Sequence, residues 1–308
     1  MSKLIPKTIL MIRPAQFGFN EEAALSNAFQ KQIPHLSPIQ IQEIATLEFD
    51  NFVRILRSNG IEVFVFDDDD EYYTPDAVFP NNWFSTCIHS QTIYTYPQKL
   101  AYRRNERRSD IITRLQKITG FEFDDSLVSY ERNGLALEGT GSMVLDHQNK
   151  TVYAAISPRT DMVVLDDWCD KTGFSKFAFK ARGGDGTLIY HTNVLMTMAD
   201  TYAVIALDTI TERSEREAFL HQMNASNKEI IEISIEQMNQ FAGNMLQLMN
   251  DQEEKCLIMS STAYRSLDKD QIELIHRHQN KIIPVPINVI ETIGGGSARC
   301  MMAEVFIP

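Results

Sequence analysis

The feature that most constrains the fold of this 308-residue chain is an internal repeat, in which a small or polar residue stands directly before a strand-like apolar stretch. Self-similarity of this kind makes each repeat one structural unit that packs against its neighbours. The five stretches are residues 82–86, 141–145, 193–197, 244–248 and 300–304, and their first residues are 59, 52, 51 and 56 positions apart. The spacing predicts five similar units along the chain.

The units also resemble one another beyond the first strand. After each of the first four stretches, a polar turn leads to a second β-rich run, which indicates a hairpin. These runs are residues 91–96, 151–155, 202–206 and 255–259. Helix-prone segments come next at residues 104–119, 214–224 and 266–278, and further strands at residues 62–66 and 281–285 lead into the following unit. The pattern predicts an α/β fold built from ββαβ repeats.

The fifth unit contains only its first strand before the chain ends at Pro308. Residues 8–12 are β-rich and supply the missing partner, so we expect the N-terminal strand to close the ring. Closure protects the strand edges and brings five equivalent strand starts to one axis. The prediction is a single propeller domain over residues 1–308. Chance similarity between short strands is the alternative, and a parallel sheet without five-fold symmetry would contradict the ring.

Composition narrows the classes of partner. The net charge of -12 argues against nucleic acid, because binding to phosphate needs clustered lysine and arginine. The one basic cluster, residues 103–108, is expected to form the solvated face of a helix rather than an anion site. No apolar run approaches the ~20 residues needed to span a bilayer, and residues 1–7 show no signal-peptide pattern, so we expect a cytoplasmic protein without a membrane partner.

The cysteines are the first candidates for a nucleophile. Cys87, Cys169, Cys256 and Cys300 are widely separated, which suggests free thiols rather than disulfides or a zinc site. Cys300 follows a glycine run and stands beside Arg299, whose charge could favour the thiolate. It is therefore the candidate nucleophile. The alternative is a core cysteine that closes the C-terminal strand, because free cysteine is often buried.

Two further polar residues come before strands of other units. Glu138 lies in the turn before the second unit, and His191 lies before the third. A ring would bring the thiol, imidazole and carboxylate together, as nucleophilic catalysis requires. Taken singly, His191 could be a buried structural histidine and Glu138 a surface acid.

Four segments together resemble the motifs of one family. They are Phe79-Pro80-Asn81-Asn82-Trp83-Phe84, Leu137-Glu138-Gly139, His191-Thr192-Asn193 and the nucleophile segment from Gly295 to Met302. In this order they resemble the guanidino-group modifying superfamily, a five-bladed α/β propeller called the pentein fold. That superfamily includes arginine deiminase, dimethylarginine dimethylaminohydrolase and the amidinotransferases, and the resemblance is closest to amidinotransferase-like citrulline-utilisation hydrolases.

The resemblance implies a mechanism without a metal or organic cofactor. Cys300 would attack the central carbon of a guanidino or ureido group, and His191 would act as general acid and base. Glu138 would hold the nitrogens of the substrate. An amidinotransferase, which passes the adduct to an amine, and a non-catalytic binding propeller remain the alternatives.

The substrate is expected to be a small amino acid. Where arginine-processing relatives carry aspartates, this chain has Asn82 and Asn193, and a neutral ureido group does not need a carboxylate partner as a buried guanidinium does. We therefore expect citrulline to be converted to ornithine. Asp76 or Asp185 could still supply the missing charge, which keeps an arginine deiminase possible.

Other candidate substrate residues rest on position alone. Arg13 could clamp the substrate carboxylate or form a structural ion pair. Asn244 would line the site or support it, and Arg299 could face the thiolate or form a salt bridge that points outward. A homo-oligomer is left open by the sequence.

Overall fold

The computed structural model describes residues 4–69 and 71–308, and in these residues the strands form five three-stranded sheets. In every sheet the central strand pairs antiparallel with one neighbour and parallel with the other. Here the antiparallel neighbour is called the first strand, the central strand the second and the parallel neighbour the third. The strands are β1 Thr8–Arg13, β2 Glu62–Asp67, β3 Phe84–Cys87, β4 Thr92–Thr95, β5 Glu122–Asp124, β6 Val144–Asp146, β7 Thr151–Ala155, β8 Ser175–Phe179, β9 Met196–Met198, β10 Tyr202–Ile205, β11 Glu229–Glu232, β12 Leu246–Met249, β13 Lys255–Ser260, β14 Lys281–Val285 and β15 Ala303–Val305.

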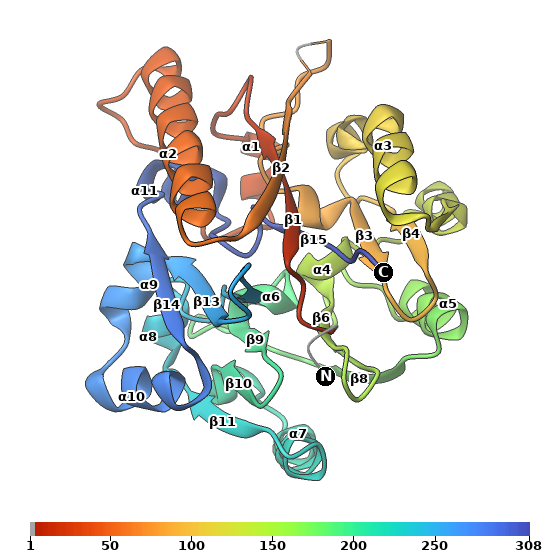
Figure 1. Ribbon diagram of the computed structural model, residues 1–308, viewed down its shortest axis with the longest axis vertical. Helices are drawn as coiled ribbons and strands as arrows, with labels where there is room; N and C mark the ends of the chain where they lie inside the picture. Colours follow the sequence, from red (N-terminus) through yellow and green to blue (C-terminus); the bar gives the residue numbers. More distant parts are fainter. Residues whose placement is uncertain (1–3, 70) are drawn as a thin grey trace.

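The ring closes through the two ends of the chain, as the repeat predicts. β15 pairs antiparallel with β1, with Thr8 opposite Val305 and Leu10 opposite Ala303, and β1 pairs parallel with β2. Figure 1 shows the sheets following one another around the molecule in chain order, with the longer helices at the periphery. The predicted five-bladed α/β propeller is confirmed. That the chain forms one catalytic domain stays a prediction.

One long helical segment lies between the second and third strand of each sheet. These are α2 Pro38–Ser58, α3 Ser109–Thr119, α5 Met162–Thr172, α7 Arg213–Ala225 and α10 Lys269–His278, the last preceded by α9 Ser261–Ser266. α2 and α5 are absent from the helices predicted above. Ser37 caps α2 by accepting from the backbone N–H of Gln40, while Pro38 occupies the first turn, where no intrahelical N–H bond is lost. Among the described residues, no helix is both long and apolar enough to cross a membrane.

The polar residues before the first strands lie in tight turns rather than in the strands themselves. The turns include the 3₁₀ helix η2 Pro80–Asn82 and the short helices α4 Gly139–Ser142 and α6 Thr192–Leu195. α4 packs against both η2 and α6. A β-carbon at Gly141 would lie 2.4 Å from the Asn82 side chain and 2.9 Å from the His191 ring, so only glycine allows this approach.

Candidate active site

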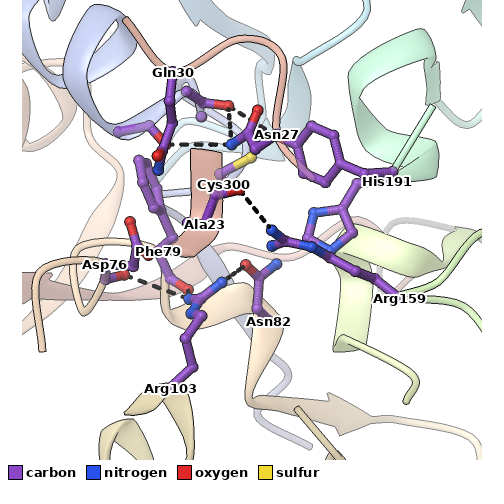
Figure 2. Close-up of a pocket in the computed structure, with 14 residues that line it drawn as sticks. Ala23, Asn27, Gln30, Asp76, Phe79, Asn82, Arg103, Arg159, His191 and Cys300 are labelled. Atoms are coloured by element: carbon purple, nitrogen blue, oxygen red, sulfur yellow. Dashed lines mark hydrogen bonds between the residues drawn. The ribbon is translucent and has the colours of Figure 1, made fainter. Parts of the chain in front are cut away.

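A narrow pocket contains both Cys300 and His191. Its free space of about 20 Å³ holds about one water molecule. Both side chains are buried, and the turns before β15 and β9 position them. Figure 2 shows Cys300 and His191 together in the pocket, with Arg103 beside Asn82. The lining residues are Ala23, Asn27, Gln30, Asp76, Phe79, Asn82, Arg103, Arg159, Tyr190, His191, Gly294, Gly295, Gly296 and Cys300.

His191 is paired with Glu138. The distance between His191 Nε2 and Glu138 Oε2 is 2.7 Å, and both side chains are buried. Burial lowers the pKa of His191 to about 4, although the carboxylate opposes this shift. Burial alone would raise the pKa of Glu138, but the charge of Arg159 and the hydrogen bond from His191 outweigh burial and hold it well below its ordinary value. His191 is therefore neutral, donates its Nε2 proton to Glu138 and keeps Nδ1 unprotonated.

Glu138 lies behind His191 and is not among the residues that line the pocket. Its Oε1 accepts from the backbone N–H of Lys99 at 3.0 Å, and its Oε2 lies 3.5 Å from Arg159 Nη1. Protein groups therefore bind both oxygens. This geometry favours a role in orienting and polarising His191 over the expected contact with substrate nitrogens.

The sulfur of Cys300 is in contact with two asparagine side chains. Asn193 Nδ2 and Asn244 Nδ2 each lie 3.3 Å from Cys300 Sγ. Neither asparagine is among the residues that line the pocket, so both lie behind the sulfur. Both amides face the sulfur of Cys300, and a contact of Asn193 or Asn244 with substrate stays a prediction.

A charged cluster forms another side of the pocket. Arg103 donates to both carboxylate oxygens of Glu106 at 2.7 and 2.8 Å and, through Nη1, to Asn82 Oδ1 at 2.6 Å. Burial raises the pKa of Glu106 to about 7 against the effect of Arg103. Asp76 Oδ2 accepts from the hydroxyl of Tyr102 at 2.6 Å. Buried side chains of both charges thus lie close together at this side.

Besides the two asparagines, three further predicted substrate residues have side chains that lie outside the pocket and contact other partners. Arg13 forms an ion pair with Asp50 at 2.8 Å on the surface, where both side chains keep solvent contact. Asp185 is exposed in the loop after β8, and its carboxylate accepts from Thr187. The guanidinium of Arg299 donates to Met302 O at 2.7 Å and to Glu304 at 2.6 Å, so it is engaged away from the sulfur.

Two arginines of the pocket were not predicted. Arg103 belongs to the basic cluster assigned above to a solvated helix face, but its side chain is only 2% exposed. The cluster does not continue into α3: residues 101–106 form a separate 3₁₀ turn that buries Arg103 beside Glu106. The spacing of the two residues is the signal that could have revealed this pair. Arg159 stands alone in a turn after β7, and no sequence pattern marks it.

The segment between β1 and α2 covers the pocket. It includes the short helix α1 Glu21–Ala24. Its Asn27 and Gln30 donate to the carbonyl oxygens of Gly295 and Gly294 at 3.2 and 3.0 Å. Ser26 accepts from Arg159 Nη2 at 2.6 Å. Because the free space beneath holds about one water molecule, the pocket must widen before a molecule of amino-acid size can enter.

Comparison with solved structures shows the same fold. The apo structure of ArgZ, an arginine dihydrolase from the ornithine-ammonia cycle in cyanobacteria, has a TM-score of 0.75 and 16% identity, and the match covers 98% of this chain and 41% of ArgZ. This chain thus spans less than half of full-length ArgZ. The N-terminal domain of ArgZ with bound substrate has a TM-score of 0.74 and 14% identity, with 98% of each chain covered.

A dimethylarginine dimethylaminohydrolase adduct with S-methyl-L-thiocitrulline has a TM-score of 0.65 and 16% identity, covering 97% of this chain and 100% of that one. A search of curated proteins found no match. The family model for N,N dimethylarginine dimethylhydrolase, eukaryotic, matches residues 13–307. Since this match takes in nearly the whole sequence, the chain belongs to the N,N dimethylarginine dimethylhydrolase family of the guanidino-group modifying superfamily.

Proposed function

We propose that this protein hydrolyses a C–N bond in the ureido or guanidino group of an arginine-related amino acid, through a covalent adduct on Cys300. The observation that carries the proposal is that Cys300 shares one buried pocket with His191, whose imidazole is bound to Glu138 at 2.7 Å. Membership of the dimethylarginine dimethylhydrolase family supports the same chemistry.

The reaction needs only groups of the chain and water. His191 first accepts the thiol proton of Cys300. The thiolate then forms a bond to the ureido carbon, and the C–N bond to the terminal nitrogen breaks as His191 passes that proton to the departing ammonia. Water, deprotonated by His191, then attacks the thiocarbamate carbon and releases the thiol. The resulting carbamate decomposes to the amine and carbon dioxide. Citrulline and one water thus give ornithine, ammonia and carbon dioxide.

The pocket offers anchors for the charged end of an amino acid. Arg159 Nε and Gln30 Oε1 are buried and have no hydrogen-bond partner among the described residues, and both side chains line the pocket. Arg159 can donate to a carboxylate, and Gln30 can accept from an ammonium group. Arg103 adds a second guanidinium. These residues replace Arg13 in the proposed carboxylate clamp.

The existing ion pairs favour citrulline. Glu106 is bound to Arg103, and Glu138 lies beside Arg159. Of the nearby carboxylates among the described residues, only Asp76, which lines the pocket, therefore has no arginine partner. A neutral ureido group needs no ionic partner, whereas a guanidinium would have only Asp76, whose Oδ2 already accepts from Tyr102. Asn82 does not supply a further partner, because its Oδ1 accepts from Arg103.

Arginine and dimethylarginine are the alternatives. Arginine is favoured by the similarity to structures of arginine dihydrolase, and dimethylarginine by the family model. Asp76 is the one pocket-lining carboxylate that could receive a guanidinium. Transfer of the adduct to an amine would make the protein an amidinotransferase.

The test is to incubate the purified protein separately with citrulline, arginine and dimethylarginine, and to measure ornithine, citrulline and ammonia by mass spectrometry and colorimetry. We expect ornithine from citrulline at the highest kcat/KM. Faster turnover of arginine would overturn the substrate assignment. A new amidino product formed only with an added amine would replace hydrolysis by transfer. Intact-mass analysis of acid-quenched samples should show the adduct on Cys300.

We further propose a cytoplasmic location, which the free thiols of Cys87, Cys169, Cys256 and Cys300 support, since such thiols persist in reducing compartments.

A further inference from the structure

The recorded polar contacts of the Cys300 sulfur are all with uncharged amides. In the described part of the chain they are Asn193 Nδ2 at 3.3 Å, Asn244 Nδ2 at 3.3 Å and Asn244 Oδ1 at 3.7 Å. The neighbouring Arg299 is engaged by Met302 and Glu304 instead. The sulfur, in a residue that is 3% exposed, is also largely shielded from water. Among the described residues, the groups in direct contact that could stabilise a negative charge on this sulfur are therefore the two amides.

Two backbone groups fix the orientation of the Asn244 side chain. Its Nδ2 donates to the carbonyl oxygen of Asn193 at 2.8 Å, and its Oδ1 accepts from the backbone N–H of Arg299 at 3.0 Å. If the amide were rotated by half a turn, its oxygen would face the carbonyl oxygen of Asn193 and its NH₂ group would face the N–H of Arg299, so the rotated orientation is excluded. The second Nδ2 proton is consequently held toward the sulfur. Asn244 is fully buried, which strengthens a hydrogen bond to a charged acceptor.

Asn193 has no other recorded polar partner for its side chain. Among the described residues, its Oδ1 is buried without a hydrogen-bond partner, and the polar contact of its Nδ2 is with Cys300 Sγ. A buried unpaired carbonyl carries a cost in stability. An asparagine that served the fold alone would be expected to satisfy this oxygen through the surrounding backbone.

We propose that Asn193 and Asn244 together form a two-donor site that stabilises the Cys300 thiolate. This inference rests on the proposed function, in which Cys300 is the nucleophile. In the thiol form, the S–H proton can be shared with Asn244 Oδ1. When that proton passes to a base, the sulfur keeps the electron pair and accepts hydrogen bonds from both Nδ2 groups. No substrate, oxidant or metal enters this step.

The test measures how fast iodoacetamide alkylates Cys300 as a function of pH, by mass spectrometry of the Cys300 peptide, without substrate. A hydrogen bond to a charged group is worth about one pKa unit. Asn193→Ala should therefore move the midpoint of the alkylation profile upward by about one pH unit. Asn244→Asp, which keeps the bond from Arg299 but turns a donor into a negative charge, should move it further. Below the midpoint, Asn193→Ala should react about tenfold more slowly.

Asn250→Asp is the matched control. Asn250 follows β12, whereas Asn244 precedes that strand. Asn250 is buried, donates to Asn59 O at 3.1 Å and accepts from backbone N–H groups. Its hydrogen bonds among the described residues do not include the Cys300 sulfur. This variant should lose stability without moving the midpoint. In each protein, alkylation of Cys169, whose pKa burial raises to about 11, serves as the internal reference.

Unchanged midpoints in folded Asn193→Ala and Asn244→Asp would overturn the proposal, as would an equal shift in Asn250→Asp. Should Asn244→Asp fail to fold by circular dichroism, Asn193→Ala decides alone, because its side chain makes no other recorded bond. Because alkylation needs no substrate, a protein that turns over none of the three amino acids would refute the proposed function and leave this test intact.

Discussion

The pocket has two sides that manage buried polarity in opposite ways. The amide side consists of the Cys300 sulfur with Asn193 and Asn244, and its recorded contacts involve no ionised partner. The charged side consists of Asp76, Arg103 and Glu106, where the ion pair between Arg103 and Glu106 is buried. Both sides exclude water, so burial by itself does not explain the difference.

Under the proposed function, the difference reflects the task of each side. A thiolate is needed only during the reaction, and neutral donors stabilise it without a permanent charge that would have to be paired in the resting protein. An amino acid instead brings a permanent carboxylate and ammonium, and fixed charges complement them. The charged side carries a cost, because burial destabilises the charged form of Glu106 and raises its pKa to about 7. Four predictions test the contrast between the two sides.

The largest expected effect is on the amide side. Cys300→Ser should lower turnover by at least about 10³-fold, because a serine hydroxyl ionises far less readily than a thiol and is the weaker nucleophile. Binding should persist, since the proposed anchors Arg159, Gln30 and Arg103 are unchanged. Steady-state rates with isothermal titration of the unreacted substrate check both parts. Retained turnover would mean that the sulfur is not the nucleophile.

On the charged side, removing one member of an ion pair should cost stability. Arg103→Met leaves Glu106 buried without its partner, and we expect a loss of about 3–5 kcal/mol in the free energy of unfolding. The double variant Arg103→Met/Glu106→Gln should recover much of this loss, because it removes the unpaired charge. Urea denaturation of both variants measures the difference. Equal losses in the two would show that the pair is not energetically coupled.

His191 joins the two sides and should impose a pH dependence on stability. Burial lowers its pKa to about 4 from 6.5, so below pH 6.5 the unfolded chain gains a proton that the folded chain does not accept until about pH 4. This contribution is fully present above pH 6.5 and is lost as the pH falls. The difference in unfolding free energy between the parent and His191→Gln should shrink by about 3 kcal/mol between pH 7 and pH 4. Parallel stability curves would contradict this.

The fold was accessible from the sequence because its signals are local and repeated. Residues 151–155 and 281–285 were predicted as strands and are β7 and β14 with the same bounds. β15 pairs with β1 as expected, because an unpaired first strand at one end and a surplus strand at the other leave few other arrangements. The first strands of the units start two or three residues later than predicted, because the polar residues before them form turns that no periodicity distinguishes from strand ends.

The site was accessible only in part. Cys300 and His191 stand at repeated positions, so the ring itself brings them together. The two arginines of the pocket are different. Arg103 reaches the pocket through a 3₁₀ turn. Arg159 is held by contacts with Glu138 and Ser26, which are 21 and 133 residues away in the sequence. Such contacts depend on tertiary packing and have no signature in spacing. The covering segment with Asn27 and Gln30 was missed for the same reason.

The smallest expected effect distinguishes a buried arginine from an exposed one. Arg13 was a candidate for the carboxylate clamp, yet its partner is Asp50, and the two side chains are 40% and 46% exposed. Arg13→Met should change the free energy of unfolding by no more than about 1 kcal/mol, because solvent screens exposed ion pairs. It should leave KM unchanged, whereas Arg159→Met should raise KM by removing a pocket donor. A matching rise in KM for Arg13→Met would place the carboxylate of the substrate outside the pocket. The proposed division of tasks between the two sides of the pocket would then be wrong.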